Sequence, residues 1–210
     1  MSTIALTDAH YPGTVSAREW SGPASKRIVT GYGFWILILS DMVMFSAFFA
    51  TYAVLLGQTA GGPSGHDLFD LRSVAIETLL LLASSFTCGL ASIAADNRSA
   101  IWFQLAMAVT CAFGLGFLAI EGKEFASLVA RGAGPSRSAF LSAFFTLVGC
   151  HGLHVSGGIL WLLTMMAQVV AKGFRPDILR RILCFALFWH ALDIIWIAVF
   201  TVVYLLGSAA

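Results

Sequence analysis

The stretch that decides the fold is residues 33–56, which read GFWILILSDMVMFSAFFATYAVLL. Asp41 is its only charged residue. A continuous apolar run longer than about 18 residues is typical of a helix that spans a bilayer. Four further runs of this kind follow, over about residues 74–95, 101–120, 139–171 and 182–206. None shows the alternating pattern of a membrane β-barrel strand. The sequence therefore predicts an all-α polytopic membrane protein, a bundle of five transmembrane helices.

The composition supports this interpretation. Of 210 residues, 59% are hydrophobic and 11% are charged, whereas a soluble domain carries about 25% charged residues. The 12 Lys and Arg residues nearly balance the 11 Asp and Glu residues, which argues against a nucleic-acid partner. The four cysteines lie singly in apolar stretches without a C-x-x-C spacing, as expected of small buried hydrophobic residues. A soluble enzyme, a nucleic-acid-binding protein and a secreted disulfide scaffold are excluded.

The polar segments between the apolar runs predict the domain boundaries and the orientation. Residues 1–30 are rich in Gly, Pro and Ser and lack the apolar region of a cleavable signal peptide, so we expect a flexible tail before a five-helix domain over residues 31–210. The tail and the loops on its side of the membrane carry eight Lys and Arg residues, and the opposite side carries four. The positive-inside rule then predicts a cytoplasmic N-terminus, and five spans put the C-terminus in the periplasm.

Ionisable residues inside the spans are the first candidates for function, because a charge at bilayer depth is costly. Asp41 lies in the first span, His151 and His154 in the fourth, and His190 and Asp193 in the fifth. Residues three apart share a helix face, so we expect these five side chains to form one polar cluster facing away from lipid. The residues alone leave three roles open, namely interhelical hydrogen bonding, proton or lipid handling, and ligation of a metal or haem.

Three glutamates form a second group of candidates. Glu77 falls in the first turn of the second span, where a carboxylate is tolerated and favours a helix N-terminus. Glu121 and Glu124 are three apart, where the third span is expected to meet the outer loop, with Lys123 between them. We interpret all three as carboxylates at helix ends, with Glu121 and Glu124 solvated rather than forming a two-carboxylate site.

Three segments taken together are more specific than any single residue. They are residues 33–52, HGLHV at 151–155 and FWHALDIIW at 188–196. In this combination the chain resembles subunit III of the haem–copper terminal oxidases. The stretch GPSRSAFLSAFF at 134–145, which leads to His151, is similar to the bacterial quinol oxidase branch of that family, the cytochrome o ubiquinol oxidase subunit III. The resemblance covers about residues 26–207 in order.

The resemblance implies roles for the candidate residues. In this family the haem, the copper and the quinol chemistry belong to subunit I, so it implies no catalytic centre, no metal site and no cofactor in this chain. It implies bound phospholipid and support of proton uptake. Asp41 matches the intramembrane carboxylate of the family, although many cytochrome c oxidase relatives have Glu there. His151 and His154 match its His-Gly-Leu-His motif, and His190 and Asp193 match its Trp-His-x-x-Asp motif.

The function implied by the resemblance is that of a non-redox subunit III of a proton-pumping terminal quinol oxidase. Such a complex oxidises ubiquinol and reduces oxygen to water in the aerobic respiratory chain of the bacterial inner membrane. The expected partners are the main subunit I and subunits II and IV. Alternatives are subunit III of a cytochrome c oxidase and an accessory subunit of a nitric oxide reductase. From other classes, a free-standing proton or solute channel and a haem-binding membrane cytochrome also stay open.

Overall fold

A computed structural model describes residues 26–61 and 70–209 of the chain. Its elements are α1 (Lys26–Leu55), α3 (Leu71–Asp96), α4 (Ala100–Ala130), α5 (Ala139–Lys172), α6 (Pro176–Val199), the π-helical segment η2 (Phe200–Leu205) and α7 (Leu206–Ala209). Five helices are long and apolar enough to cross a membrane, the last of them running from Pro176 through η2 to Leu205. The expectation of an all-α polytopic protein with five long apolar helices is confirmed.

The helix bounds differ from the expected spans at three places. The helix α1 begins at Lys26, so residues 26–30 belong to it and residues 1–25 of the expected tail lie outside the described residues. The helix α4 continues to Ala130, ten residues beyond the expected end at Ile120. The helix α6 begins at Pro176 instead of residue 182, with Pro at a position where no intrahelical hydrogen-bond donor is needed.

Neighbouring helices are joined by short turns with recognisable ends. The α3–α4 turn places Arg98 at φ 54°, and the Ser99 N–H returns to the Ala94 carbonyl at 2.9 Å. The Ser138 hydroxyl accepts the Leu141 N–H at 3.2 Å and so caps the start of α5. Gly173 ends α5 at φ 66°, a conformation that favours glycine. These ends make α3–α4 and α5–α6 two antiparallel hairpins.

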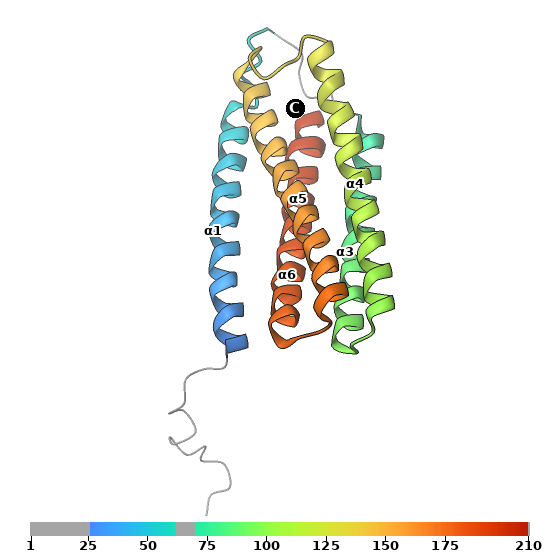
Figure 1. Ribbon diagram of the computed structural model, residues 1–210. Helices are drawn as coiled ribbons and strands as arrows, with labels where there is room; N and C mark the ends of the chain where they lie inside the picture. Colours follow the sequence, from blue (N-terminus) through green and yellow to red (C-terminus); the bar gives the residue numbers. More distant parts are fainter. Residues whose placement is uncertain (1–25, 62–69, 210) are drawn as a thin grey trace, which may run out of the picture.

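The helices are arranged around α6 (Figure 1). The α3–α4 hairpin lies on one side, α5 packs against both α4 and α6, and α1 packs chiefly on α5 and α6 at the opposite side. The start of α1, the α3–α4 turn and the α5–α6 loop lie at one end of the bundle. The α4–α5 loop and the C-terminus lie at the other.

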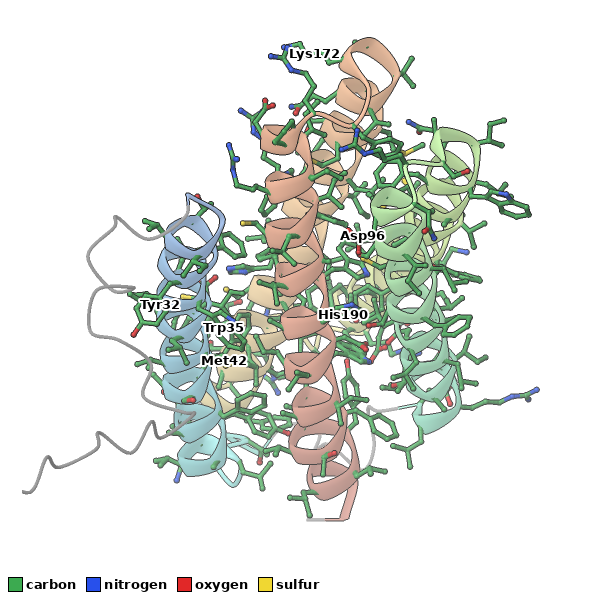
Figure 2. All side chains as sticks on the ribbon, turned by 90° about the horizontal axis from the view of Figure 1, so that it is seen from below. Tyr32, Trp35, Met42, Asp96, Lys172 and His190 are labelled. Atoms are coloured by element: carbon green, nitrogen blue, oxygen red, sulfur yellow. The ribbon has the colours of Figure 1, made fainter. Side chains whose placement is uncertain are left out.

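The exterior is apolar around the bundle, as expected of a surface in contact with lipid. On α1, the large hydrophobic side chains Tyr32 and Trp35 are exposed, and Figure 2 shows them on this peripheral helix. Leu79, Leu153 and Ile194 give α3, α5 and α6 similar exposed surfaces.

The buried side chain of Trp189 packs in the core where α6 meets α4 and α5. A Cβ atom built on Gly158 of α5 would lie 2.8 Å from Cζ3 of Trp189, and one on Gly114 of α4 would lie 3.2 Å from its Cη2. Carbon atoms prefer separations of about 3.5–4.0 Å. The two glycines therefore allow the helix backbones to approach the indole ring as small residues do in membrane bundles.

Candidate functional site

The central polar feature is a ladder of side-chain hydrogen bonds between the antiparallel helices α3 and α6. Its three rungs are Ser84–Trp189 at 3.1 Å, Ser85–His190 at 2.7 Å and Thr78–Trp196 at 3.1 Å. In the first and third rungs the indole N–H donates to a hydroxyl oxygen on α3. Each buried indole N–H thereby has a partner, and the ladder fixes how α3 and α6 are aligned.

His151 lies inside the bundle and is fully buried. Its ring centre lies 5.1 Å from that of Trp196, with the two ring planes tilted by 32°, and it meets Phe117 and Phe45 edge-on at 5.8 and 6.4 Å. Neither ring nitrogen has a hydrogen-bond partner among the described residues. His151 therefore occupies an aromatic enclosure, where it contacts rings instead of polar groups.

His154 and Asp41 lie at the contact between α5 and α1. The Nδ1 atom of His154 lies 2.8 Å from the carbonyl oxygen of Cys150, one turn earlier on its own helix. Phe45 of α1 meets the His154 ring at 5.3 Å. Asp41 lies one turn before Phe45 on α1, and its charge acts on the Cys150 thiol. Both Asp41 and His154 are half-buried.

His190 and Asp193 lie at the contact between α6 and α3. Figure 2 shows His190 on the side of α6 that faces α3, where its Nδ1 atom is paired with the Ser85 hydroxyl. Asp193 lies close enough to His190 for their charges to attract. Asp193 and His151 line the same narrow gap in the packing of α3, α5 and α6, which is too small to hold a water molecule.

The structure therefore divides the expected five-residue cluster into three parts. Asp41 and His154 lie between α1 and α5, His151 lies in the aromatic core, and His190 and Asp193 lie between α3 and α6. Among residues 26–61 and 70–209 no group of three His, Cys, Asp or Glu side chains is placed to hold a metal ion.

The three glutamates are placed differently from the expectation, and their assignment to helix ends is wrong for Glu77 and Glu121. Glu77 is fully buried and Glu121 is 4% exposed, so neither lies at a solvated helix end. The reason is that α4 runs on to Ala130, which leaves Glu121 nine residues inside the helix, or about 14 Å from its end at 1.5 Å per residue. Both carboxylate oxygens of Glu77, Glu121 and Glu124 are buried, and none has a hydrogen-bond partner among the described residues.

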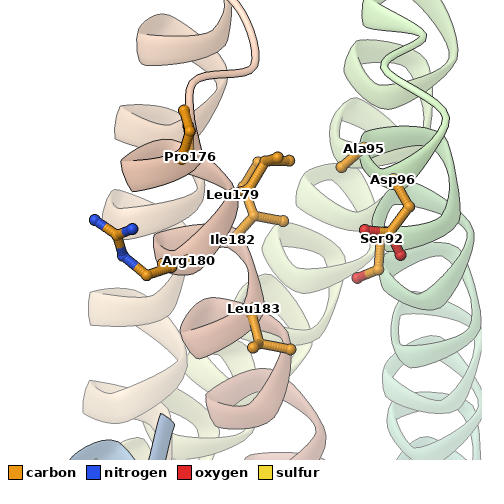
Figure 3. A pocket seen from close by; sticks show the side chains of 8 residues that line it. All are labelled: Ser92, Ala95, Asp96, Pro176, Leu179, Arg180, Ile182 and Leu183. Carbon is orange, nitrogen blue, oxygen red and sulfur yellow. The ribbon is translucent and has the colours of Figure 1, made fainter. Parts of the chain in front are cut away.

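A groove of about 250 Å³ opens at the end of the bundle where the α3–α4 turn lies, between the end of α3 and the start of α6. Figure 3 shows Ser92 and Asp96 on its α3 wall and Leu179 and Leu183 on its α6 wall. The Arg180 guanidinium points away from Asp96 in this view. The groove contains none of the candidate residues from the sequence.

The sequence reasoning missed the hydroxyl side chains of α3 that complete the ladder. Thr78 pairs with Trp196, whereas Ser84 and Ser85, which lie later on α3, pair with Trp189 and His190, which lie earlier on α6, as antiparallel helices require. Trp189 and Trp196 are seven residues apart, and their partners Ser84 and Thr78 are six apart. This similar spacing of about two helical turns was the available signal.

Comparison with known proteins identifies the family. The family described as cytochrome c oxidase subunit III matches residues 6–208 of the chain. The chain is 52% identical over 179 residues to the cytochrome bo(3) ubiquinol oxidase subunit 3 of Pseudomonas aeruginosa, covering 85% of this chain and 86% of the relative. It is 43% identical over 175 residues to the quinol oxidase subunit 3 of Bacillus subtilis, with 83% and 86% covered. It is 41% identical over 175 residues to the cytochrome c oxidase subunit 3 of Bacillus sp. (strain PS3), with 83% and 84% covered. The chain therefore belongs to the cytochrome c oxidase subunit III family.

Proposed function

We propose that this chain is the non-redox third subunit of a proton-pumping terminal quinol oxidase. In the complex, ubiquinol is oxidised and oxygen is reduced to water, and the haem and copper belong to subunit I. The observation that carries the proposal is the 52% identity to a ubiquinol oxidase subunit 3 over 85% of the chain. The chain itself contributes no redox step.

The interior of the bundle supports a structural role for the histidines. Of the three histidines in the described part of the chain, His190 is paired with Ser85 and His154 with a backbone carbonyl, while His151 is enclosed by aromatic rings. Hydrogen bonding between helices is therefore the role that the observed contacts favour for His190, among those the sequence left open. Asp41, on the peripheral helix α1, is assigned to lipid contact and support of proton uptake.

We assign the end of the bundle with the start of α1 to the cytoplasm of a bacterium, and the C-terminus to the periplasm. The α3–α4 turn and the α5–α6 loop lie at the same end as the start of α1 (Figure 1). These segments and the tail carry eight of the 12 basic residues. A cysteine introduced at Ser99 should react with a membrane-impermeant thiol reagent only after the cells are opened. Labelling of Ser99→Cys in intact spheroplasts would contradict the orientation.

The partners follow from the same proposal. Five spans with exposed apolar side chains on every outer face give this subunit surfaces for subunit I, for subunits II and IV and for phospholipid acyl chains. The inner membrane is the corresponding location.

The experiment that tests the proposal is purification of the tagged chain from native membranes in mild detergent. A haem-containing large subunit and smaller subunits should copurify, and the reduced-minus-oxidised spectrum should show haem. The purified complex should oxidise ubiquinol. A single colourless chain that stays intact would contradict the proposal and favour a free-standing proton channel, which requires proton flux by the chain alone in liposomes.

A second candidate is subunit III of a cytochrome c oxidase. The 41% identity to a cytochrome c oxidase subunit 3 is the observation that favours it. The same purified complex distinguishes the two candidates, because a quinol oxidase consumes oxygen with ubiquinol and a cytochrome c oxidase consumes it with reduced cytochrome c.

A further inference from the structure

We propose that Glu77, Glu121 and Glu124, with Tyr204, form a proton-binding site inside the membrane domain. The site exchanges protons with the aqueous phase at the end of the bundle where the α4–α5 loop lies. The inference concerns residues of this chain alone and does not depend on which electron donor the complex uses. It is carried by the convergence of three buried carboxyl groups and by a cavity that reaches one of them.

The carboxyl groups converge from two helices. Glu121 and Glu124 lie one turn apart on α4, and Glu77 comes from α3, which packs along α4. The charge of Glu124 acts on Glu77, and the charges of Glu77 and Glu124 both act on Glu121. Glu77 is fully buried, has no hydrogen-bond partner among the described residues, and faces the acidic pair from a separate element. The three groups thus share one region of the interior.

Among the described residues, no cation forms an ion pair with these carboxyl groups. Lys123 lies between the glutamates in sequence and is exposed; it lines the same cavity as Glu124 but forms no ion pair with a glutamate among the described residues. Arg131 attracts Glu124 over a distance, but it donates to the Ser127 hydroxyl at 2.9 Å and forms no ion pair with a glutamate among the described residues. Asp70 adds a further negative charge near Glu124.

Protons are the ligand that fits this arrangement. Several unpaired carboxylates in an apolar interior are strongly unfavourable, and such groups become neutral by holding protons or by binding a cation. In the described part of the chain, no carboxyl group belongs to a set placed for metal binding. Each proton taken up forms one O–H bond and removes one negative charge, so the site needs no other reactant.

Tyr204 brings a third element to the site. Its side chain is fully buried and interacts electrostatically with all three glutamates. Tyr204 belongs to η2, where the last span changes from α-helical to π-helical hydrogen bonding, and π-helical turns occur frequently at functional sites. The Tyr52 hydroxyl of α1 donates to the Val203 carbonyl at 3.1 Å and so holds η2 in position.

A cavity of about 250 Å³ connects the site to the end of the bundle. It lies between the start of α3 and the last turns of α4, and its polar lining consists of Asp70, Ser73, Lys123, Glu124, Ser127 and Arg131. A water molecule takes about 30 Å³ in the liquid, so the cavity has room for several. Water in the cavity can pass a proton to Glu124, which lies between the cavity and the more deeply buried Glu121 and Glu77.

The test is infrared spectroscopy of the purified oxidase complex that contains this chain. We expect a C=O stretching band of protonated carboxylic acid at neutral pH, weaker in Glu77→Gln and in Glu121→Gln. Glutamine has the shape of a protonated glutamate and no charge, so both variants should assemble. The matched control is Asp96→Asn, which changes an exposed carboxyl group at the opposite end of α3 and should leave the band unchanged.

Transfer into deuterated water tests the route. The acid band should shift within the time of the solvent exchange, and Ser127→Leu, which fills the cavity, should slow that shift several-fold. The proposal is overturned by the absence of an acid band, by a band that neither glutamine variant weakens, or by failure of both glutamine variants to assemble. An unchanged shift in Ser127→Leu overturns the cavity as the route. Haem content and ubiquinol oxidation of the same samples report on the proposed function separately.

Discussion

The contact of Gly158 with Trp189 allows a prediction with a calculable size, for the variant Gly158→Ala. The added Cβ atom would lie 2.8 and 3.1 Å from Cζ3 and Cε3 of the Trp189 ring and 3.2 Å from Cε1 of Phe188. Optimal carbon contacts lie at about 3.5–4.0 Å, so the indole ring has to move by several tenths of an ångström. That movement also lengthens the bond from the Trp189 N–H to the Ser84 hydroxyl, now 3.1 Å.

The expected cost follows from three contributions. Overpacking of a close-packed interior costs about 1–3 kcal/mol. A buried N–H left without its acceptor costs up to about 1–3 kcal/mol. Replacing Gly by Ala inside a helix contributes about 0.5–1 kcal/mol in the stabilising direction. The free energy of unfolding of Gly158→Ala should therefore fall by about 2 kcal/mol, taking the middle of these ranges with the indole bond weakened but not lost.

The chain offers a matched control at the neighbouring residue. A Cβ atom on Gly157 would meet nothing within 4 Å, so Gly157→Ala should leave the unfolding free energy unchanged or raise it slightly. The assay is denaturant unfolding of the chain in mixed detergent micelles, followed by tryptophan fluorescence. Trp189→Phe removes the crowded part of the ring, so the double variant should lose less stability than the sum of the two single variants. Equal stability of Gly158→Ala and Gly157→Ala would refute the reasoning.

Three further outcomes are expected. Thr78→Val leaves the buried Trp196 N–H without its acceptor and should lower the unfolding free energy by about 1–3 kcal/mol. The control Thr51→Val removes an exposed hydroxyl that is bonded within its own helix and should change the unfolding free energy by less than about 0.5 kcal/mol. Equal effects of the two variants would contradict the hydrogen-bond ladder between α3 and α6. His151→Phe exchanges a buried imidazole, whose nitrogens have no hydrogen-bond partner among the described residues, for an apolar ring of similar size. The complex should therefore assemble with normal haem content and be at least as heat-stable as the wild type. Loss of assembly would show that the imidazole is needed. Asp41→Ala should leave haem content unchanged but shorten the active life of the oxidase during turnover, and equal inactivation rates in variant and wild type would count against a role for Asp41.

The number and type of the helices could be predicted from sequence because span formation depends on local composition. Each span needs about 20 apolar residues, and such a run can be recognised in the sequence without knowing which helices pack against it. The end of the third span was predicted wrongly because Glu121 and Glu124, with Lys123 between them, resemble a solvated turn. In the structure, the two glutamates turn inward towards Glu77 while Lys123 faces outward, and the helix continues. Which face is buried depends on the neighbouring helix, and local composition does not contain that information.

The grouping of the histidines shows the same limit. His151 and His154 are three residues apart, and at 3.6 residues per turn this spacing leaves them about 60° apart around the axis. That angle is enough to send His151 into the aromatic core and His154 towards α1. Sequence spacing predicted a shared face, but the division between two interfaces depends on where α1 and α6 pack against α5.

The peripheral position of α1 has a consequence for biosynthesis. This helix packs chiefly on α5 and α6, yet it ends at Leu55, whereas α5 begins only at Ala139. At about 5–20 residues per second, the ribosome needs on the order of 4–17 s to synthesise the intervening chain. During this interval the helices to which α1 binds have not yet been made, so the face of α1 that carries Phe45 and Tyr52 has to be covered by lipid or by another protein until α5 and α6 are present. The helices therefore do not pack in the order in which they are synthesised. The α3–α4 hairpin forms first, and α1 packs into the bundle only after α5 and α6 have been made.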